Sequence, residues 1–240
     1  MYFYVDDELI NIDDNTEPYG IGTEGQVYKI GDEIFKLYFY NTLDEGYGNK
    51  YYFHKYLKSL NPKQIALPQK LIFDTDGNYV GYTAHYVDGD VNENNGLTLL
   101  PSELFIANLR ALVEDIKYLS REKVLMADVS PWNTIFDKKD NLLFLIDPGR
   151  YQSHSFDNIP SFDYEMQNMF QFNLLIGILL DLDFKEYNPV EDEEKSKKLI
   201  SYIVDEINKY KGSYLDFFES VLEKHENVYE YARTLKAKIN

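Results

Sequence analysis

Two carboxylates and an amide stand in the middle of the chain, at the borders of short strand-like runs. Asp128 and Asn133 lie five positions apart, after a helical pattern and before the run 134–136. Asp147 comes fourteen positions beyond Asn133, after the run 142–146. Side-chain oxygens of these types can orient a hydroxyl group, or hold a hard cation such as Mg²⁺, which takes few protein ligands and keeps several waters. These three residues are therefore the first candidates for a site.

A glycine-rich turn lies near the start of the chain. Residues 20–27 read G-I-G-T-E-G-Q-V and match G-x-G-x-x-G-x-V, with glycines at Gly20, Gly22 and Gly25. The backbone amides of such a turn can approach phosphate oxygens because no Cβ atom intervenes. A second strand follows rather than a helix, which excludes a Rossmann unit. A glycine-rich hairpin without any ligand would show the same pattern.

A lysine interrupts the next strand-like run, where Lys36 stands between Phe35 and Leu37. Such a lysine could extend from an edge strand and carry its ammonium group into water. Its place one strand after the glycine-rich turn favours phosphate binding instead.

The order of these features resembles the protein-kinase-like superfamily. The resemblance consists of D-x-x-x-x-N from Asp128 to Asn133, D-x-G at Asp147, the glycine-rich turn, the strand lysine, and the segment 82–89, which is similar to a hinge between lobes. It extends in order and spacing over about residues 16–180.

The resemblance implies a bilobal, protein-kinase-like α+β fold. A small β-rich N-lobe would occupy residues 1–86, a hinge or linker residues 87–96, and a helical C-lobe with a reduced activation segment residues 97–240.

The same resemblance implies ATP and Mg²⁺ as cofactors and assigns roles to the polar residues. Lys36 would contact the α- and β-phosphates, Asp147 would bridge the Mg²⁺ ions, and Asn133 would hold the second ion. Asp128 would accept or orient the proton of the acceptor hydroxyl.

The family also encloses the adenine ring between apolar side chains, and Val27, Ile34 and Ile135 stand at the corresponding positions. The backbone near His85 and Tyr86 would hydrogen-bond the edge of the base.

Four positions near the expected active site depart from the family. Met126 and Ala127 replace the usual His-Arg, so an activation-loop phosphate would find no arginine there. Ser130 stands where serine/threonine kinases carry a lysine. Pro148 replaces the phenylalanine of D-F-G, and its fixed φ should restrict rotation of that segment.

The acid that should pair with Lys36 is not evident in the helical pattern 49–60. Asn49 or Phe53 occupies its position, and Glu45 comes too early unless the helix starts sooner. A different partner for Lys36 or a lowered activity would follow.

The later chain departs from the family as well. No A-P-E motif precedes the apolar helix expected near 166–181, and Phe172 or its neighbour replaces the aspartate expected in that helix. A short activation segment is typical of atypical and small-molecule kinases, such as the aminoglycoside and choline kinases.

Hydrophobic patterning predicts the local structure along the chain. We expect strands at 26–30, 33–38, 66–73, 79–86, 134–136 and 142–146, helices at 49–60, from Pro101 to 119, near 166–181, near 192–210 and near 213–236, and a linker at 91–96.

Composition narrows the function classes. Lys+Arg is 24 and Asp+Glu is 41, so the formal net charge is 24 − 41 = −17, which disfavours nucleic acid and anionic membranes as partners. The chain has no cysteine, and its N-terminus lacks the basic and apolar regions of a signal peptide. No apolar run is long enough to span a membrane. We expect a cytoplasmic protein.

The leading hypothesis is an ATP- and Mg²⁺-dependent phosphotransferase acting on a hydroxyl group, as an atypical protein kinase. A small-molecule kinase is one alternative, and the negative charge would then favour a cationic acceptor. A pseudokinase that binds nucleotide or acts as a scaffold is another alternative, and transfer of AMP instead of phosphate is a third.

Overall fold

The computed structural model describes residues 1–40, 50–91, 100–137, 139–157, 159–161, 163–182 and 214–227, with scattered residues between 198 and 237. The described chain is mixed α+β, which confirms the coarse fold class predicted from the sequence. Its internal contacts divide it into two units. The first unit comprises Met1–Pro62, Ala66–Val87 and Asp147–Phe162, and the second comprises Lys63–Ile65, Asp88–Ile146 and Asp163–Asn240.

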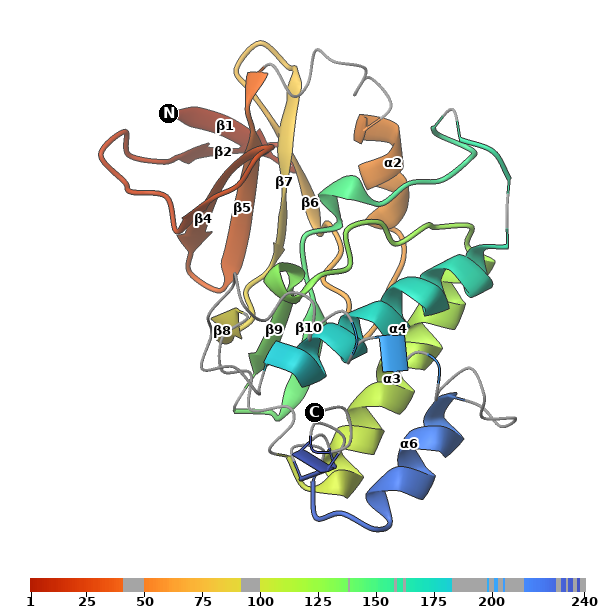
Figure 1. Cartoon of the computed structure of the whole chain (residues 1–240). Helices are drawn as coiled ribbons and strands as arrows, with labels where there is room; N and C mark the ends of the chain where they lie inside the picture. Colours follow the sequence, from red (N-terminus) through yellow and green to blue (C-terminus); the bar gives the residue numbers. More distant parts are fainter. Residues whose placement is uncertain are drawn as a thin grey trace. The chain divides into compact units, whose positions relative to one another are not determined.

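The first unit is built on one antiparallel sheet of seven strands (Figure 1). The spatial order is β2-β1-β6-β7-β5-β4-β3. The strands are β1 (Tyr2–Val5), β2 (Glu8–Asn11), β3 (Gly20–Ile21), β4 (Gly25–Ile30), β5 (Glu33–Tyr38), β6 (Lys70–Phe73) and β7 (Tyr79–His85). The strands predicted at 26–30, 33–38 and 79–86 are confirmed, and the one predicted at 66–73 begins only at Lys70.

The hairpin of β1 and β2 was not predicted from the sequence. Val5 pairs with Glu8, so only Asp6 and Asp7 form the turn, and both have positive φ, 45° and 72°. Such a two-residue turn suits the twist of a hairpin, but Asn-Gly or Asp-Gly is its usual signature. Two adjacent aspartates instead accept the left-handed conformation that aspartate tolerates better than most residues.

The two faces of the sheet carry different chemistry because side chains alternate along a strand. On β5, Phe35 and Leu37 point to one face and pack with buried Val5, Tyr28 and Ile72. Lys36, between them, and Tyr38, which follows Leu37, belong to the opposite face. The polar candidate residue is thus placed by the same alternation that fills the core.

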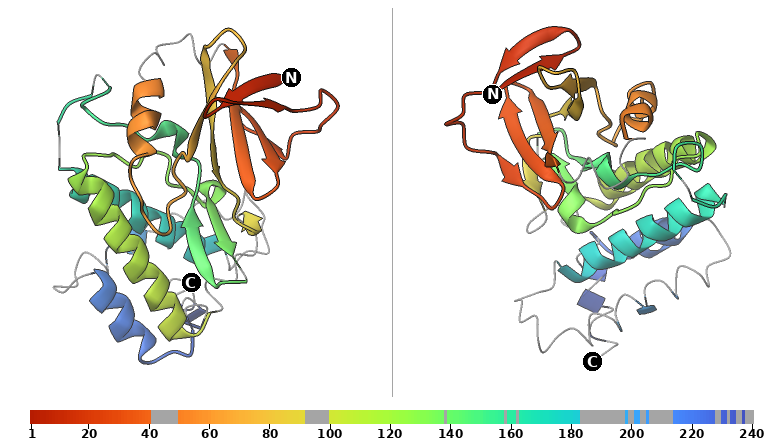
Figure 2. Two further views of the ribbon diagram at one scale, coloured as in Figure 1. Left: turned by 180° about the vertical axis from the view of Figure 1, so that it is seen from behind. Right: turned by 90° about the horizontal axis from the view of Figure 1, so that it is seen from above.

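Helix α2 (Lys50–Leu57) lies beside β6 and β7 on the face of Lys36 (Figures 1 and 2). It confirms the helix predicted at 49–60 but ends earlier, because Ser59 and Leu60 donate to carbonyls three residues back, which tightens the last turn. The helix buries His54, whose Nδ1 is hydrogen-bonded to the Tyr79 hydroxyl at 2.5 Å.

The second unit combines helices with a small sheet. Its elements are β8 (Gly89–Val91), α3 (Ser102–Arg121), the 3-10 turn η3 (Pro131–Asn133), β9 (Thr134–Asp137), β10 (Leu142–Leu145), α4 (Tyr164–Leu182) and α6 (Tyr214–Leu222). The strands form an antiparallel sheet in the order β10-β9-β8. Helix α3 packs against α4 and α6 (Figure 2). Its apolar stripe, formed by Leu109, Leu112, Ile116 and Leu119, is fully buried.

Most elements predicted in this unit are confirmed, with three differences. The hinge or linker predicted at 87–96 contains a strand, since Gly89–Val91 pairs with β9, and residues 92–99 lie outside the described residues. Nearly all of the helix predicted at 192–210 also lies outside them. The helix predicted at 213–236 is interrupted, because α6 ends at Leu222, the chain turns over residues 223–226, and described residues are helical again from Glu230.

No helix within the described residues combines the length and apolarity needed to cross a bilayer.

Candidate functional site

Strand register places Lys36 in the middle of a row of side chains. Val27 of β4 and Tyr82 of β7 are its Cα partners on the two sides, so the three side chains share one face of the sheet. Ile34 and Ala84, paired two positions along, belong to the same face. Two of the residues expected beside adenine, Val27 and Ile34, are therefore on the face of Lys36.

The Lys36 side chain, only 7% exposed, contacts two carboxylates. Its Nζ donates to Asp147 Oδ1 and lies 3.5 Å from Glu24 Oε2. Asp147 is 111 residues away in sequence, and both residues belong to the first unit. The structure thus brings together two residues that the sequence predicts to share a site.

Glu24 is the acidic partner that the sequence did not reveal. It lies in the glycine-rich turn, not on α2, and its side chain is only 10% exposed. Its second oxygen, Oε1, accepts from Lys50 Nζ at 3.0 Å. Val27 lies on the Lys36 face, so strand alternation would place Gln26, and then Glu24, on the opposite face. The turn, and not the alternation of the strand, therefore directs Glu24 to Lys36.

Lys50, the first residue of α2, is a second buried cation. Its Nζ lies 4.4 Å from the centre of the Tyr38 ring as well as against Glu24. Burial lowers the pKa of Lys50, and the charge of Glu24 acts in the opposite direction. A lysine thus stands at the start of the helix in which the family resemblance led us to seek an acid.

Asp147 has a strained backbone. It adopts a left-handed conformation, φ 57° and ψ 68°, immediately before Pro148, and its carboxylate accepts from the Gly149 N–H. Only a few per cent of residues other than glycine have positive φ, and strain of this kind concentrates at functional sites. The following 3-10 turn, η4 (Pro148–Arg150), fixes the segment in this form.

Tyr82 contacts the same carboxylate, since its hydroxyl donates to Asp147 Oδ1 at 3.3 Å. Burial, and then the negative charge of Asp147, raise the pKa of Tyr82 well above its usual value. The hydroxyl therefore stays protonated and remains a donor. Sequence analysis placed this tyrosine in the hinge segment and assigned it no contact with Asp147.

Gly149 allows the charged groups to approach one another. A Cβ atom at this position would lie 2.7 Å from Glu24 Oε2, 2.9 Å from Lys36 Nζ and 3.1 Å from Asp147 Oδ1. Any side chain here would therefore displace the ionic groups. The glycine of D-x-G is required by the cluster itself.

The three glycines of the turn are not equivalent. A Cβ at Gly25 would lie 2.1 Å from the Leu37 carbonyl oxygen on β5, so strand pairing requires glycine there. A Cβ at Gly20 would have no neighbour within 4 Å, and one at Gly22 only the Gly25 carbonyl oxygen at 3.9 Å. The packing of the chain does not itself require glycine at these two positions.

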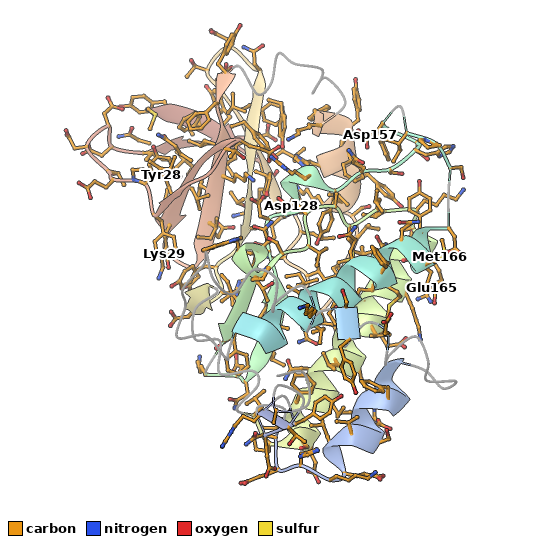
Figure 3. The ribbon with its side chains drawn as sticks, viewed as in Figure 1. Tyr28, Lys29, Asp128, Asp157, Glu165 and Met166 are labelled. Atoms are coloured by element: carbon orange, nitrogen blue, oxygen red, sulfur yellow. The ribbon has the colours of Figure 1, made fainter. Side chains whose placement is uncertain are left out.

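Asp128 and Asn133 come together in the second unit. Asp128, labelled in Figure 3, has a left-handed backbone with φ 61°, and Asn133 Nδ2 donates to its carbonyl oxygen at 2.9 Å. The Asn133 carbonyl in turn accepts from the Ile146 N–H. The loop that carries both residues is thus fixed by its own hydrogen bonds and tied to the end of β10.

A buried amide on α4 holds the chain ahead of Asp128. Asn168 is fully buried, and its Oδ1 accepts from the Met126 N–H at 2.8 Å while its Nδ2 donates to Ser120 and Val124. Phe172, which with its neighbour stands where the family resemblance led us to expect an aspartate, is itself fully buried.

Three other residues were expected beside the base: His85, Tyr86 and Ile135. His85 is exposed, and the Tyr86 N–H donates to the Asp32 carbonyl at 3.1 Å. Lys29, labelled on β4 in Figure 3, lies with its Nζ 3.5 Å from the centre of the Tyr86 ring. Ile135 is half-buried on β9 of the second unit.

The side chains that the family resemblance assigns to Mg²⁺ carry oxygen donors, the type of ligand that hard cations prefer. Within the described ranges, no three His, Asp or Glu side chains gather to form a metal site on their own. Mg²⁺ instead binds through one or two protein oxygens together with waters and substrate phosphates. Asp147 and Asn133 are of the right chemical type for that mode of binding.

No protein-family model matches the chain, and no curated protein matches it either.

Proposed function

We propose that the protein is an ATP- and Mg²⁺-dependent phosphotransferase of the protein-kinase-like, bilobal class, most simply an atypical protein kinase. The observation that carries the proposal is the contact between Lys36 and Asp147. The sequence pattern assigns one residue to nucleotide phosphates and the other to Mg²⁺, and both functions need them close together.

Three further observations support the proposal. Val27, Ile34 and Ala84 share the Lys36 face, where an apolar ring could lie. Asp128 and Asp147 both have positive φ, which is unusual for aspartate outside functional or turn positions. Gly20 and Gly22 leave the backbone of the turn open to close approach by a ligand.

Under the proposal, each residue has a definite task. Lys36 neutralises phosphate charge, Asp147 and Asn133 supply oxygen ligands to Mg²⁺, and Asp128 takes or orients the proton of the acceptor hydroxyl. ATP bound with Mg²⁺ supplies the phosphoryl group. The acceptor, a protein or a small hydroxyl compound, and the cytoplasmic location remain predictions.

Thermal unfolding in the presence and absence of Mg²⁺-ATP tests the proposal. Ligand that binds the native state stabilises it, by about 2.7 kcal/mol at a ligand concentration of one hundred times Kd, and therefore raises Tm. The Asp147→Asn variant should lose most of that shift, whereas Asp128→Ala should keep it and lose transfer. Asp76→Asn, in the exposed β6–β7 turn, is the matched control. A wild type whose Tm does not respond to Mg²⁺-ATP would refute the proposal.

Intact-mass measurement after incubation with ATP separates the classes of reaction. Addition of a phosphoryl group indicates protein phosphorylation, and addition of a nucleotide indicates AMP transfer. An unchanged mass together with ATP consumption in the presence of small hydroxyl compounds indicates a small-molecule kinase. Binding of ATP without any transfer is the result expected of a pseudokinase.

A further inference from the structure

Four ionic groups, three of which surround Gly149, form a series of alternating charge. Lys50 contacts Glu24, Glu24 contacts Lys36, and Lys36 contacts Asp147. Two lysines and two carboxylates sum to zero formal charge. Lys50, Glu24 and Lys36 are each at most 10% exposed, so removal of any one of these three leaves an unbalanced charge in a poorly solvated place.

In this series of charged groups, Glu24 is the residue that contacts both lysines. Its two oxygens divide between them, with Oε1 at 3.0 Å from Lys50 and Oε2 at 3.5 Å from Lys36. Lys50 in turn is confined by the Tyr38 ring. The Glu24 carboxylate is therefore held from one side by a residue of α2 and presents its other side to Lys36.

The backbone of the turn that carries Glu24 is also fixed. The Glu24 carbonyl accepts from the Phe39 N–H, the Gly22 N–H donates to the Gly25 carbonyl, and Arg150 lies 3.4 Å from the Thr23 hydroxyl. The position of Glu24, the counter-ion of Lys36, therefore depends on the conformation of the glycine-rich turn.

We propose that Glu24 is a positioning residue of the nucleotide site: anchored by Lys50, it holds the Lys36 ammonium group in the orientation that meets nucleotide phosphates. The inference rests on the proposed function and adds two residues to it. The turn, and not the helix, then supplies the acid on which Lys36 depends. Lys50 acts through Glu24.

The test measures the reactivity of individual lysines together with nucleotide affinity, so it does not depend on the acceptor. Wild type, Glu24→Gln, Lys50→Met, Lys50→Arg and the double variant Glu24→Gln/Lys50→Met are acylated with and without Mg²⁺-ATP, and each lysine is quantified by mass spectrometry. The partly exposed pair Glu33–Lys70 lies in the same unit, 2.7 Å apart, and Glu33→Gln is the control.

We expect Glu24→Gln to increase acylation of Lys36 in the absence of nucleotide, because the ammonium group has lost one carboxylate partner. Loss of a charged hydrogen bond corresponds to about 10- to 100-fold weaker binding of Mg²⁺-ATP. Lys50→Met should have a similar effect, Lys50→Arg should restore affinity, and the double variant should be no worse than the more affected single variant, because both residues act as one unit. Glu33→Gln should bind like wild type.

Circular dichroism and Tm of each variant without nucleotide show whether it is folded. If Lys50→Met does not fold, Lys50→Arg takes its place in the test. A folded Glu24→Gln protein that binds Mg²⁺-ATP as tightly as wild type, with Lys36 equally protected, would overturn this inference and leave the proposed function intact. A wild type that neither binds Mg²⁺-ATP nor shows protection of Lys36 would overturn both.

Discussion

The stability of the protein should decrease as the pH is lowered from neutral to mildly acidic, because of one buried histidine. His54 is fully buried on α2, stacked against Tyr38 and hydrogen-bonded to Tyr79. Burial, and then the positive charges of Lys50 and Lys36, lower the pKa of His54 from 6.5 to about 3. The folded protein therefore keeps this ring neutral where the unfolded chain protonates it.

The sign and size of the effect follow from that difference. The contribution of His54 is fully present above the unfolded pKa of 6.5 and is lost as the pH falls toward about 3. Each pH unit well inside this window costs about 1.4 kcal/mol of unfolding free energy, and the whole window roughly 5 kcal/mol. Between about pH 7.5 and about pH 5.5, before most carboxylates titrate, the loss is about 1.4 kcal/mol.

Urea denaturation across this range measures the effect. His54→Gln retains a hydrogen-bonding group for Tyr79 but cannot titrate, so its curve should be flatter than that of wild type by that amount. The exposed His85→Gln is the matched control and should keep the wild-type slope. Equal slopes for wild type and His54→Gln, or NMR titration of the folded His54 ring near pH 6.5, would refute the reasoning.

Three substitutions probe other parts of the structure. Gly149→Ala should lower the free energy of Mg²⁺-ATP binding, measured by titration calorimetry, more than it lowers the free energy of unfolding. The reason is that its Cβ would displace the flexible end of Lys36 and not backbone. Equal losses of the two free energies would contradict this. Gly25→Ala should lower the urea midpoint strongly, by an amount that corresponds to several kcal/mol, since the Leu37 carbonyl oxygen cannot move without breaking strand pairing; a wild-type midpoint would count against the register. Asn168→Ala should lower the unfolding free energy by about 2–4 kcal/mol, because a buried N–H and a buried C=O lose their partner; a loss below 1 kcal/mol, on the order of an exposed hydrogen bond, would show that water replaces it.

The sequence was sufficient where side-chain alternation decides the structure. On β5 the apolar residues Phe35 and Leu37 could only face a core, and the pairing of β4, β5 and β7 then put Val27, Lys36 and Tyr82 on the opposite face. Hydrophobic periodicity likewise predicted α3 close to its observed start at Ser102.

The sequence was insufficient where a turn or a single long-range contact decides. Glu24 stands in a polar turn, where an acidic side chain is ordinarily solvated. Its burial is explained only by its contacts with Lys36 and Lys50 in the folded protein. The role of Asn168 depends on a backbone N–H 42 residues away in sequence, at Met126. Neither contact follows from spacing along the chain.

The chain has one tryptophan, and its position turns it into an optical probe. Trp132 immediately precedes Asn133 in η3, and 68% of its surface is exposed to solvent. Excitation at the red edge of the absorption band selects this indole over the 22 tyrosines. Its emission colour and quenching by iodide therefore report on the loop that carries Asp128, without a label and without an assay for any acceptor.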